Sequence, residues 1–297
     1  MEASFPAMEG SGRAGLTCPM TQNDAEKTTL VTGGTGKTGR RVAAGLRARG
    51  LPVRIGSRSG NPPFDWNDPG TWEPALRDAG SVYLSYQPDL VAPGAVEAVG
   101  ALAGRAVAAG ARRLVLLSGR GEEEAERAEE AVRDSGAEWT VVRASWFCQN
   151  FDEGHLLEPV LGGAIALPAG DVAEPFADAG DIADVAVAAL TEPGHAGRVY
   201  EVTGPRLLTF ADAAEEIAEA SGREVRYVPV SVDGYASMLV EYGVPAGEAE
   251  MLAAMFGKVL DGRNAHLGDG VRRALGRDPR DFTDYAEAAA ATGVWKG

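Results

Sequence analysis

Short runs of apolar and β-branched residues alternate with amphipathic segments through the first half of the chain. The runs predict buried strands, at 28–32, 52–56, 81–85, 112–117 and 139–142. Apolar residues at helical spacing predict helices between them, over 37–50, 70–79, 93–110 and 122–135. Strands that alternate with helices of this length form βαβ units, and such strands pair in parallel. We therefore predict an α/β fold with a doubly wound parallel sheet.

The pattern changes after residue 145, where helical stretches dominate, at 182–190, 210–221, 232–242 and 248–260. Two short strands are predicted among them, at 198–202 and 225–228. The pattern leaves open whether one or both return to the sheet. We divide the chain into a flexible N-terminal extension (1–27), a core of alternating strands and helices (28–150) and a small, mostly helical C-terminal lobe (151–297).

Composition and charge narrow the class of protein. Of the 297 residues, 45% are hydrophobic and 24% are charged, which is typical of a globular protein. The formal net charge of -15 repels phosphate backbones and anionic lipids. We therefore expect a small-molecule ligand, and neither nucleic acid nor a membrane as partner. The sequence does not set the oligomeric state, and a homodimer is one option.

Cysteine and histidine are too few and too scattered for a disulfide framework or a structural metal site. The cysteines are Cys18 and Cys148, and the three histidines show no metal-binding spacing. We therefore predict no metal and a reducing, cytoplasmic location. Residues 1–27 lack the apolar segment of a signal peptide.

The strongest motif joins the first predicted strand to the first predicted helix. It is Gly33-x-x-Gly36-x-x-Gly39. The first two glycines permit a tight turn and the close approach of a diphosphate, and Gly39 lets the helix pack on the strand. The positive end of the helix then faces the diphosphate. This context predicts a Rossmann-type dinucleotide site in the core.

Two other interpretations of the motif are weaker. Glycine-rich turns that bind nothing are common, but the position at the first strand–helix junction favours a binding turn. Gly36-Lys37-Thr38 matches the end of a P-loop. However, Val31 stands where the first glycine of Gly-x-x-x-x-Gly-Lys-Thr is needed.

The end of the second predicted strand indicates which cofactor binds. An NAD site places a carboxylate there, on the ribose 2′-hydroxyl. This chain instead carries Gly56-Ser57-Arg58-Ser59. Arg58 can pair with a 2′-phosphate, and Arg40 is a second candidate for the same phosphate. The alternative is that both are solvated surface arginines. We predict NADP(H) in preference to NAD(H).

The Tyr-x-x-x-Lys dyad of most short-chain dehydrogenases is absent. In that dyad the lysine lowers the pKa of the tyrosine, which exchanges a proton with a carbonyl. No lysine of this chain lies four residues after a tyrosine, and the expected stretch, 121–132, is rich in glutamate. The acceptor of a hydride should therefore be electrophilic already: a quinone, an imine or iminium, an enone or a cationic dye.

Longer motifs resemble the NmrA-like group of atypical short-chain dehydrogenases. Thr32–Arg40 is similar to the TGATGxxG opening of that group, and Arg143–Phe151 is similar to its Arg-Pro-x-x-Phe-x-Glu-Asn-Phe loop. The C-terminal part, with Tyr242-Gly243-Val244-Pro245, looks most like the quinone oxidoreductase and triphenylmethane reductase branch. The resemblance runs from about Thr28 to the C-terminus. It implies a core that binds NADP(H) and a lobe that shapes the pocket.

The resemblance also places the cofactor by position. The implied contacts are Gly33, Thr35, Gly36, Lys37, Thr38, Gly39 and Arg58, then Asp65 and Trp66 beside the adenine, and Leu84, Ser85, Tyr86, Ser118 and Ser145 at strand ends. Ala144-Ser145 replaces the Pro-Gly of the group, and Gln149 replaces its Glu. Both departures lie where nicotinamide and substrate should meet, so substrate choice stays open.

Tyr86 and Ser118 are the catalytic candidates, because ligands of open α/β sheets bind at the carboxyl ends of the strands. A packing tyrosine and an ordinary turn serine are the alternatives. An aromatic substrate pocket is predicted from residues near the resembling loop and in the lobe: Trp146, Phe147, Asn150, Phe151 and Tyr242. Core packing explains the aromatic side chains of this set equally well.

The sequence as a whole predicts an NADPH-dependent reductase that transfers hydride to an electron-poor small molecule without a Tyr-Lys dyad. Two alternatives are kept. One is a non-catalytic protein that senses NADP(H), and the other is a biosynthetic isomerase or cyclase on the same fold.

Overall fold

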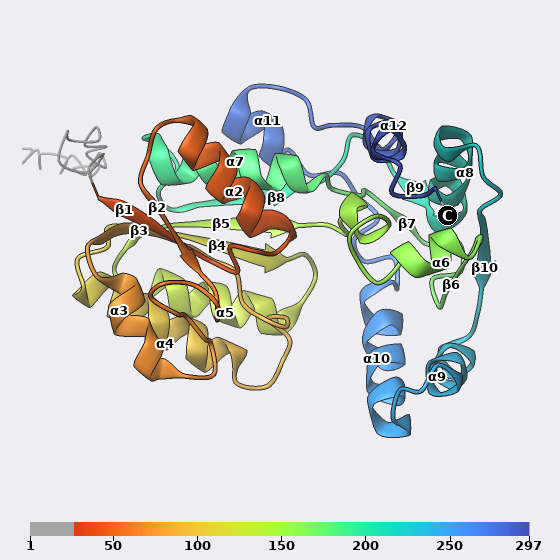
Figure 1. Cartoon of the computed structure of the whole chain (residues 1–297), viewed down its shortest axis with the longest axis horizontal. Coiled ribbons are helices and arrows are strands. Elements are labelled where there is room, and N and C mark those ends of the chain that lie inside the picture. The colour runs from red at the N-terminus through yellow and green to blue at the C-terminus, as the bar shows by residue number, and fades with distance from the viewer. Residues whose placement is uncertain (1–26, 297) are drawn as a thin grey trace, which may run out of the picture.

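A six-stranded parallel sheet forms the centre of the molecule (Figure 1). The computed structural model describes residues 27–296, so most of the predicted extension, including Cys18, lies outside the described residues. In spatial order the strands are β2 (Val53–Gly56), β1 (Thr28–Thr32), β3 (Ala79–Leu84), β4 (Arg113–Gly119), β5 (Glu138–Ala144) and β8 (Arg198–Val202). All neighbouring pairs are parallel. The order steps outward in both directions from β1, which confirms the predicted doubly wound α/β fold.

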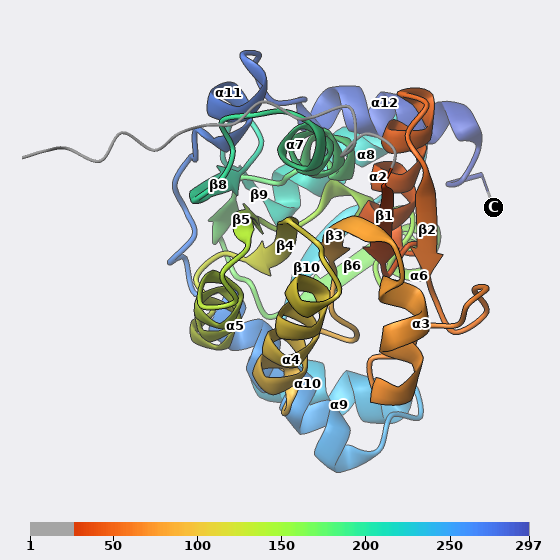
Figure 2. The same cartoon turned by 90° about the vertical axis from the view of Figure 1, so that its left-hand side faces the viewer.

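Helices cover both faces of this sheet (Figure 2). One face carries α2 (Lys37–Ala48), α7 (Ala179–Thr191) and α11 (Gly270–Leu275), and the other carries α3 (Trp72–Leu76), α4 (Ala95–Ala108) and α5 (Glu123–Arg133). On β1, Leu30 packs in the cluster of α3, α4 and α5, and Val31 packs in the cluster of α2 and α7. Because both faces are buried, the strands appear in the sequence as continuous apolar runs.

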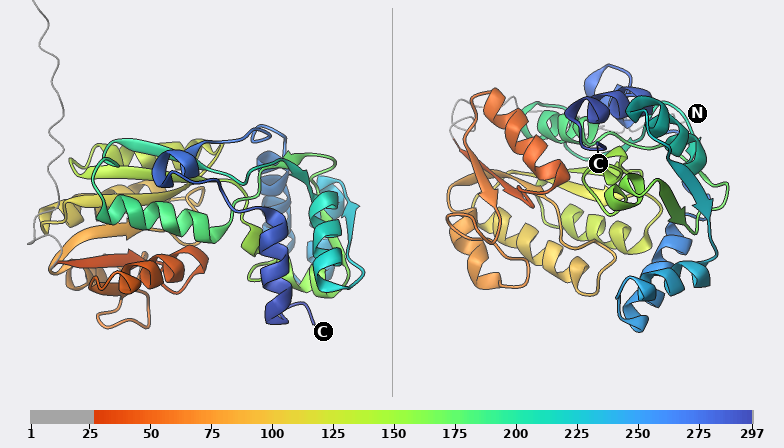
Figure 3. Two further views of the ribbon diagram at one scale, coloured as in Figure 1. Left: turned by 90° about the horizontal axis from the view of Figure 1, so that it is seen from above. Right: turned by 45° about the vertical axis from the view of Figure 1, so that its right-hand side comes forward.

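The lobe stands beside the carboxyl ends of the strands (Figures 1 and 3). Its helices are α6 (Leu157–Leu161), α8 (Phe210–Ser221), α9 (Val232–Glu241), α10 (Ala246–Val259) and α12 (Phe282–Thr292). Two small sheets complete it: β6 (Ala164–Leu167) with β10 (Arg226–Pro229), and β7 (Ala173–Glu174) with β9 (Leu208–Thr209). Its centre is aromatic, and the rings of Phe151, Phe176, Phe210 and Phe282 contact one another. No helix within residues 27–296 has the length and apolar character needed to cross a membrane.

Local signals explain where helices begin and end. The helix predicted at 210–221 is α8, because Thr209 forms a capping box with Asp212 and Gly222 ends the helix with φ 67°. The helix predicted at 70–79 is shorter. It divides into a 3-10 turn, η1 (Pro69–Thr71), and α3, and the chain then turns through Asp78, with φ 59°, into β3.

An aspartate on α7 ties the core to the segment that leads into α12. The side chain of Asp181 is 1% exposed and accepts hydrogen bonds from the guanidinium groups of Arg277 and Arg280 and from the backbone N–H of Arg280. Asp184, one turn later, contacts the same two arginines but is 46% exposed. Arg277 and Arg280 therefore each pair with one buried carboxylate, Asp181, and one solvated carboxylate, Asp184.

Removal of the buried carboxylate should cost more than removal of the exposed one. Asp181→Ala should lower the free energy of unfolding by about 2–4 kcal/mol, because it removes several charge-assisted hydrogen bonds. Asp184→Ala, the matched control, should lower it by less than about 1 kcal/mol. Urea denaturation followed by tryptophan fluorescence measures both, and equal losses would show that burial does not decide the contribution.

Candidate active site

In the turn between β1 and α2, backbone atoms of neighbouring segments lie very close together. Gly33 has φ 60°, and its carbonyl accepts the N–H of Gly36 at 2.9 Å. A Cβ at Gly39 would lie 2.2 Å from the Gly33 carbonyl oxygen, so only glycine fits there. No side chain caps α2 at Gly36. The first-turn amides are therefore available to an anion at the positive end of the helix.

The neighbouring strand end is hydrogen-bonded to this turn. Thr32 Oγ1 accepts the N–H of Ser85 at 2.8 Å, and a Cβ at Gly33 would lie 3.2 Å from Ser85 Oγ. The carbonyl of Ser85 accepts the indole N–H of Trp66 at 3.0 Å. The Trp66 ring lies 4.9 Å from the ring of Tyr86. The structure thus brings Trp66 together with the end of β3, which is bonded to the turn after β1.

The two arginines proposed for a 2′-phosphate differ in their surroundings. Arg58 follows β2, is exposed, and makes no hydrogen bond or ion pair within the described part of the chain. The Arg40 guanidinium, by contrast, pairs with Glu153, as does that of Arg41. Of the two, Arg58 alone is left free to meet a phosphate.

A buried ionic network holds the side chain of Ser118. Its hydroxyl donates to Glu129 at 2.8 Å. Glu129 is fully buried and also accepts two hydrogen bonds from Arg143, at 2.6 and 2.7 Å, and one from Arg133. This network joins β4, β5 and α5. It gives Ser118 a structural role and offers no support for a catalytic one.

A cluster of aromatic side chains on the lobe, called the aromatic wall, begins just after the end of β5. Trp146 follows β5, and its ring contacts His155 and Phe256 at 5.9 and 5.6 Å. His155 and Tyr235 lie at 5.4 Å from Phe256. The indole N–H of Trp146 is buried and has no partner within the described residues. The wall comprises Trp146, His155, Tyr235 and Phe256.

Three predicted pocket residues lie apart from this wall. Phe151 is fully buried in the aromatic centre of the lobe. Phe147 packs against the cluster of α2 and α7. Tyr242 follows α9 and is 82% exposed. Tyr235, on α9, belongs to the wall through its contact with Phe256, and the sequence did not single it out.

A lysine joins the glycine turn to the loop that carries Trp146. Lys37, the first residue of α2, donates from Nζ to Asn150 Oδ1 at 2.6 Å. Burial lowers the pKa of Lys37, and Glu153 and Asp152 oppose this effect. A Cβ at Gly154 would lie 2.6 Å from the same ammonium.

The histidine of the wall is neutral at physiological pH. His155 is exposed, yet desolvation by the surrounding protein and then the charge of Lys37 lower its pKa to about 4. A neutral imidazole can donate or accept a hydrogen bond but is not an acid near pH 7.

The two departures from the resembling loop have structural partners. Ser145 Oγ accepts from Arg120 at 2.8 Å, and the Arg120 side chain is 2% exposed. Gln149 donates to Asp178 and accepts the N–H of Ala179, each at 2.7 Å. Gln149 therefore fixes the Trp146 loop to the start of α7.

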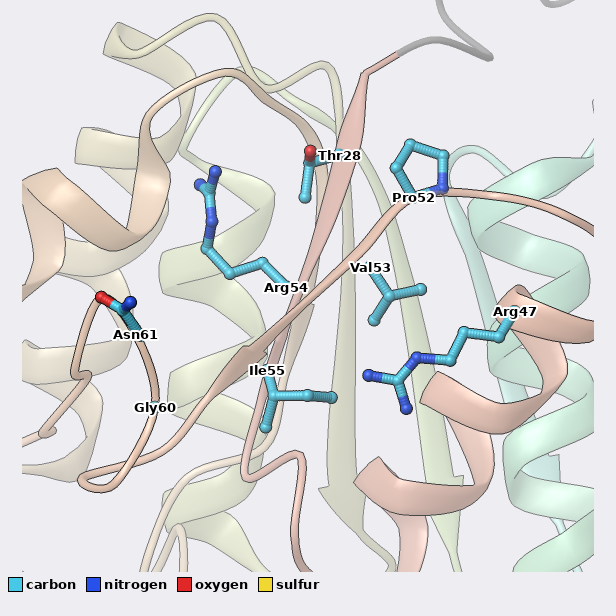
Figure 4. Close-up of a pocket in the computed structure, with 8 residues that line it drawn as sticks. All are labelled: Thr28, Arg47, Pro52, Val53, Arg54, Ile55, Gly60 and Asn61. Atoms are coloured by element: carbon cyan, nitrogen blue, oxygen red, sulfur yellow. The ribbon is translucent and has the colours of Figure 1, made fainter.

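A separate hollow lies along the outer strand β2 (Figure 4). It is lined by Thr28, Arg47, Pro52, Val53, Arg54, Ile55, Gly60 and Asn61. It includes none of the predicted site residues. Within residues 27–296 no group of His, Cys, Asp and Glu side chains could hold a metal ion.

Comparison with known proteins shows to which family the chain belongs. No protein-family model matches the chain. Agroclavine dehydrogenase of Claviceps fusiformis is 34% identical over 280 residues, which is 87% of this chain and 96% of that protein. The NAD(P)H azoreductase of Xenophilus azovorans is 30% identical over 291 residues, covering 88% of this chain and 98% of that protein.

Solved structures show the same fold. The triphenylmethane reductase of Citrobacter sp., in complex with NADP(H), has a TM-score of 0.70 at 22% identity over 89% of this chain and 99% of its own. NmrA, a negative transcriptional regulator, has a TM-score of 0.66 at 17% identity over 92% of this chain and 100% of its own. The chain belongs to the NmrA-like family of atypical short-chain dehydrogenases/reductases.

Membership of the NmrA-like family confirms one prediction. The chain is an NAD(P)H-dependent oxidoreductase that binds a nicotinamide cofactor. The chain itself fits such a group, because the Gly33–Gly39 turn leaves no room for side chains where the backbone must approach a diphosphate.

The close approach at Gly39 can be tested directly. Gly39→Ala should weaken NADPH and NADH binding by tenfold or more, about 1.4 kcal/mol, because the new Cβ must push the Gly33 carbonyl out of the turn. Fluorescence titration with either dinucleotide measures the effect. Gly104→Ala is the control. This helical glycine has open space around its Cβ position, so binding should not change and stability should rise by about 0.5–1 kcal/mol.

Proposed function

We propose that the chain is an NADPH-dependent reductase of a flat, electron-poor small molecule. The acceptor would lie between the carboxyl edge of the sheet and the aromatic wall of the lobe. The observation that carries the proposal is this wall, which stands beside the Lys37–Asn150 contact and therefore next to the glycine turn.

The cofactor choice rests on Arg58. This exposed side chain follows the second strand, where an NAD site would carry a carboxylate. An unpaired guanidinium at this place favours a 2′-phosphate, with which it can form charge-assisted hydrogen bonds.

The acceptor class rests on the wall and on the missing dyad. Four ring systems gather here, with the planes of contacting rings 49–81° apart, and such aromatic side chains can pack against a conjugated acceptor. His155 is neutral, and no described tyrosine has a lysine four residues on, so neither supplies a strong acid. Relatives whose names denote a clavine dehydrogenase, an azoreductase and a triphenylmethane reductase support such an acceptor.

In this reaction NADPH would supply the hydride. The chain would bind the diphosphate on the first-turn amides of α2, hold the acceptor flat against Trp146 and Phe256, and exclude water through the apolar faces of the lobe. Orientation and desolvation would thus be its main contributions.

Turnover decides between a reductase and a sensor. With NADPH and a panel of quinones, enones, iminium ions and cationic dyes, we expect loss of nicotinamide absorbance with at least one acceptor class. Tight NADPH binding without oxidation by any acceptor would contradict the proposal and favour a sensing protein.

The 2′-phosphate assignment has its own test. Arg58→Ala should weaken NADPH binding by about 1.5–3 kcal/mol, the value of hydrogen bonds to a charged group, and leave NADH binding unchanged. Arg47→Ala, which removes an exposed arginine far along α2, is the control and should change neither. An equal loss for both dinucleotides would place the phosphate elsewhere.

A further inference from the structure

Glu122 stands in the stretch where the Tyr-Lys dyad is expected and absent. It connects β4 to α5 with extended backbone angles, φ -109° and ψ 114°, and Glu123 begins the helix. The side chain of Glu122 makes no capping hydrogen bond to that helix. Its carboxylate therefore does not cap the helix, although it stands at the capping position.

The carboxylate lies over the end of the central strand β4. A Cβ at Gly119, the last residue of β4, would be 2.3 Å from Glu122 Oε2. Gly119 pairs with Ala144, the last residue of β5, and Trp146 of the aromatic wall follows two residues later. In open α/β sheets this edge is where ligands bind. The Glu122 carboxylate has no hydrogen bond or ion pair within residues 27–296.

Negative neighbours surround this group. Burial raises the pKa of Glu122 to about 7, and the charges of Asp89, in the loop after β3, and of Glu124, on α5, contribute in the same direction. Lys258 on α10 opposes the shift. A carboxyl group in this setting keeps its proton near neutral pH, as a general acid must.

The nearby cations are already engaged. Lys258 reaches Glu124 at 4.0 Å. Arg263, from the segment after α10, donates to the carbonyl of Gly121 and pairs with Asp261. Neither cation forms an ion pair with Glu122, which leaves its carboxyl group free to act.

We propose that Glu122 is the proton donor for acceptors whose reduction leaves a negative oxygen, namely conjugated carbonyl compounds such as quinones and enones. This inference rests on the proposed reductase function. The acceptor carbon gains a hydride from the reduced nicotinamide, and the π electron pair moves onto the carbonyl oxygen. That oxygen forms a bond to the proton of the Glu122 carboxyl group. Glu122 is left as a carboxylate and takes a proton from solvent.

Cationic acceptors have a different requirement. An iminium ion or a triphenylmethane dye becomes neutral when it gains hydride and needs no proton. Reduction of a conjugated carbonyl compound should therefore depend on Glu122, and reduction of a cationic acceptor should not. The aromatic wall alone predicts no such difference, so this difference provides the test.

The experiment compares a naphthoquinone with a cationic triphenylmethane dye, both with NADPH. Glu122→Gln should lower kcat/KM for the quinone by about 10²-fold, within the range of general acid catalysis, and leave the dye within about threefold. Glu123→Gln is the matched control. It makes the same Glu-to-Gln change at an exposed neighbour that pairs with Arg127, and should change neither rate.

The pH profile of kcat/KM shows which protonation state of Glu122 is active. Because the protonated form is the active one, kcat/KM for the quinone should fall as pH rises through about 7 in the unmodified protein. The fall should be absent in Glu122→Gln and absent for the dye. A quinone profile that is unchanged in Glu122→Gln would overturn the proposal.

A readout without cofactor separates this proposal from the proposed function. Difference infrared spectra of the unmodified protein and Glu122→Gln should show a carboxylic acid band that titrates near neutral pH. Gly119→Ala, whose Cβ displaces the carboxylate, should shift that titration to lower pH and reproduce the selective loss with the quinone. A Glu122 ionised throughout the neutral range, or equal losses for quinone and dye, would overturn the inference. Inactivity of the unmodified protein with every acceptor would instead overturn the reductase function.

Discussion

The contact between Gly39 and the Gly33 carbonyl is the constraint on which the rest of the site depends. It brings the start of α2 against the end of β1 and leaves the first-turn amides uncapped. The same turn places Thr32 where it can hydrogen-bond the end of β3, so β1 and β3 end side by side. A side chain at either glycine would separate the elements that form the cofactor edge.

A few polar contacts hold the lobe at a fixed place beside this edge. Asp181 and Asp184 bind the arginines that precede α12, Gln149 binds the start of α7, and Glu153 pairs with Arg41 on α2. They attach the lobe on the side of α2 and α7. Beside α5, Lys258 on α10 pairs with Glu124 at 4.0 Å, and Arg263, from the segment after α10, donates to the carbonyl of Gly121. The lobe is thus fastened to the core both beside α2 and α7 and beside α5.

The sequence predicted the sheet and its helices well, because strands buried on both faces and helices with caps leave clear local patterns. The strand at 28–32 and the helix at 210–221 have the predicted bounds. The site was less predictable. The glycine turn is a local motif, but the aromatic wall joins Trp146, Tyr235 and Phe256 from three distant segments, and no local pattern encodes their meeting. Ser118 shows the same limit, since its hydrogen-bond partner Glu129 lies on α5, a helix that the sequence describes only as acidic.

The position of Lys37 has an energetic consequence for the free protein. Its ammonium stands at the positive end of α2, where a cation is unfavourable by about 0.3–1 kcal/mol, and burial adds to that cost. An anion bound at the turn compensates both the charge of the Lys37 ammonium and the positive end of α2. A dinucleotide bound at this turn should therefore make the folded chain more resistant to unfolding than the free chain.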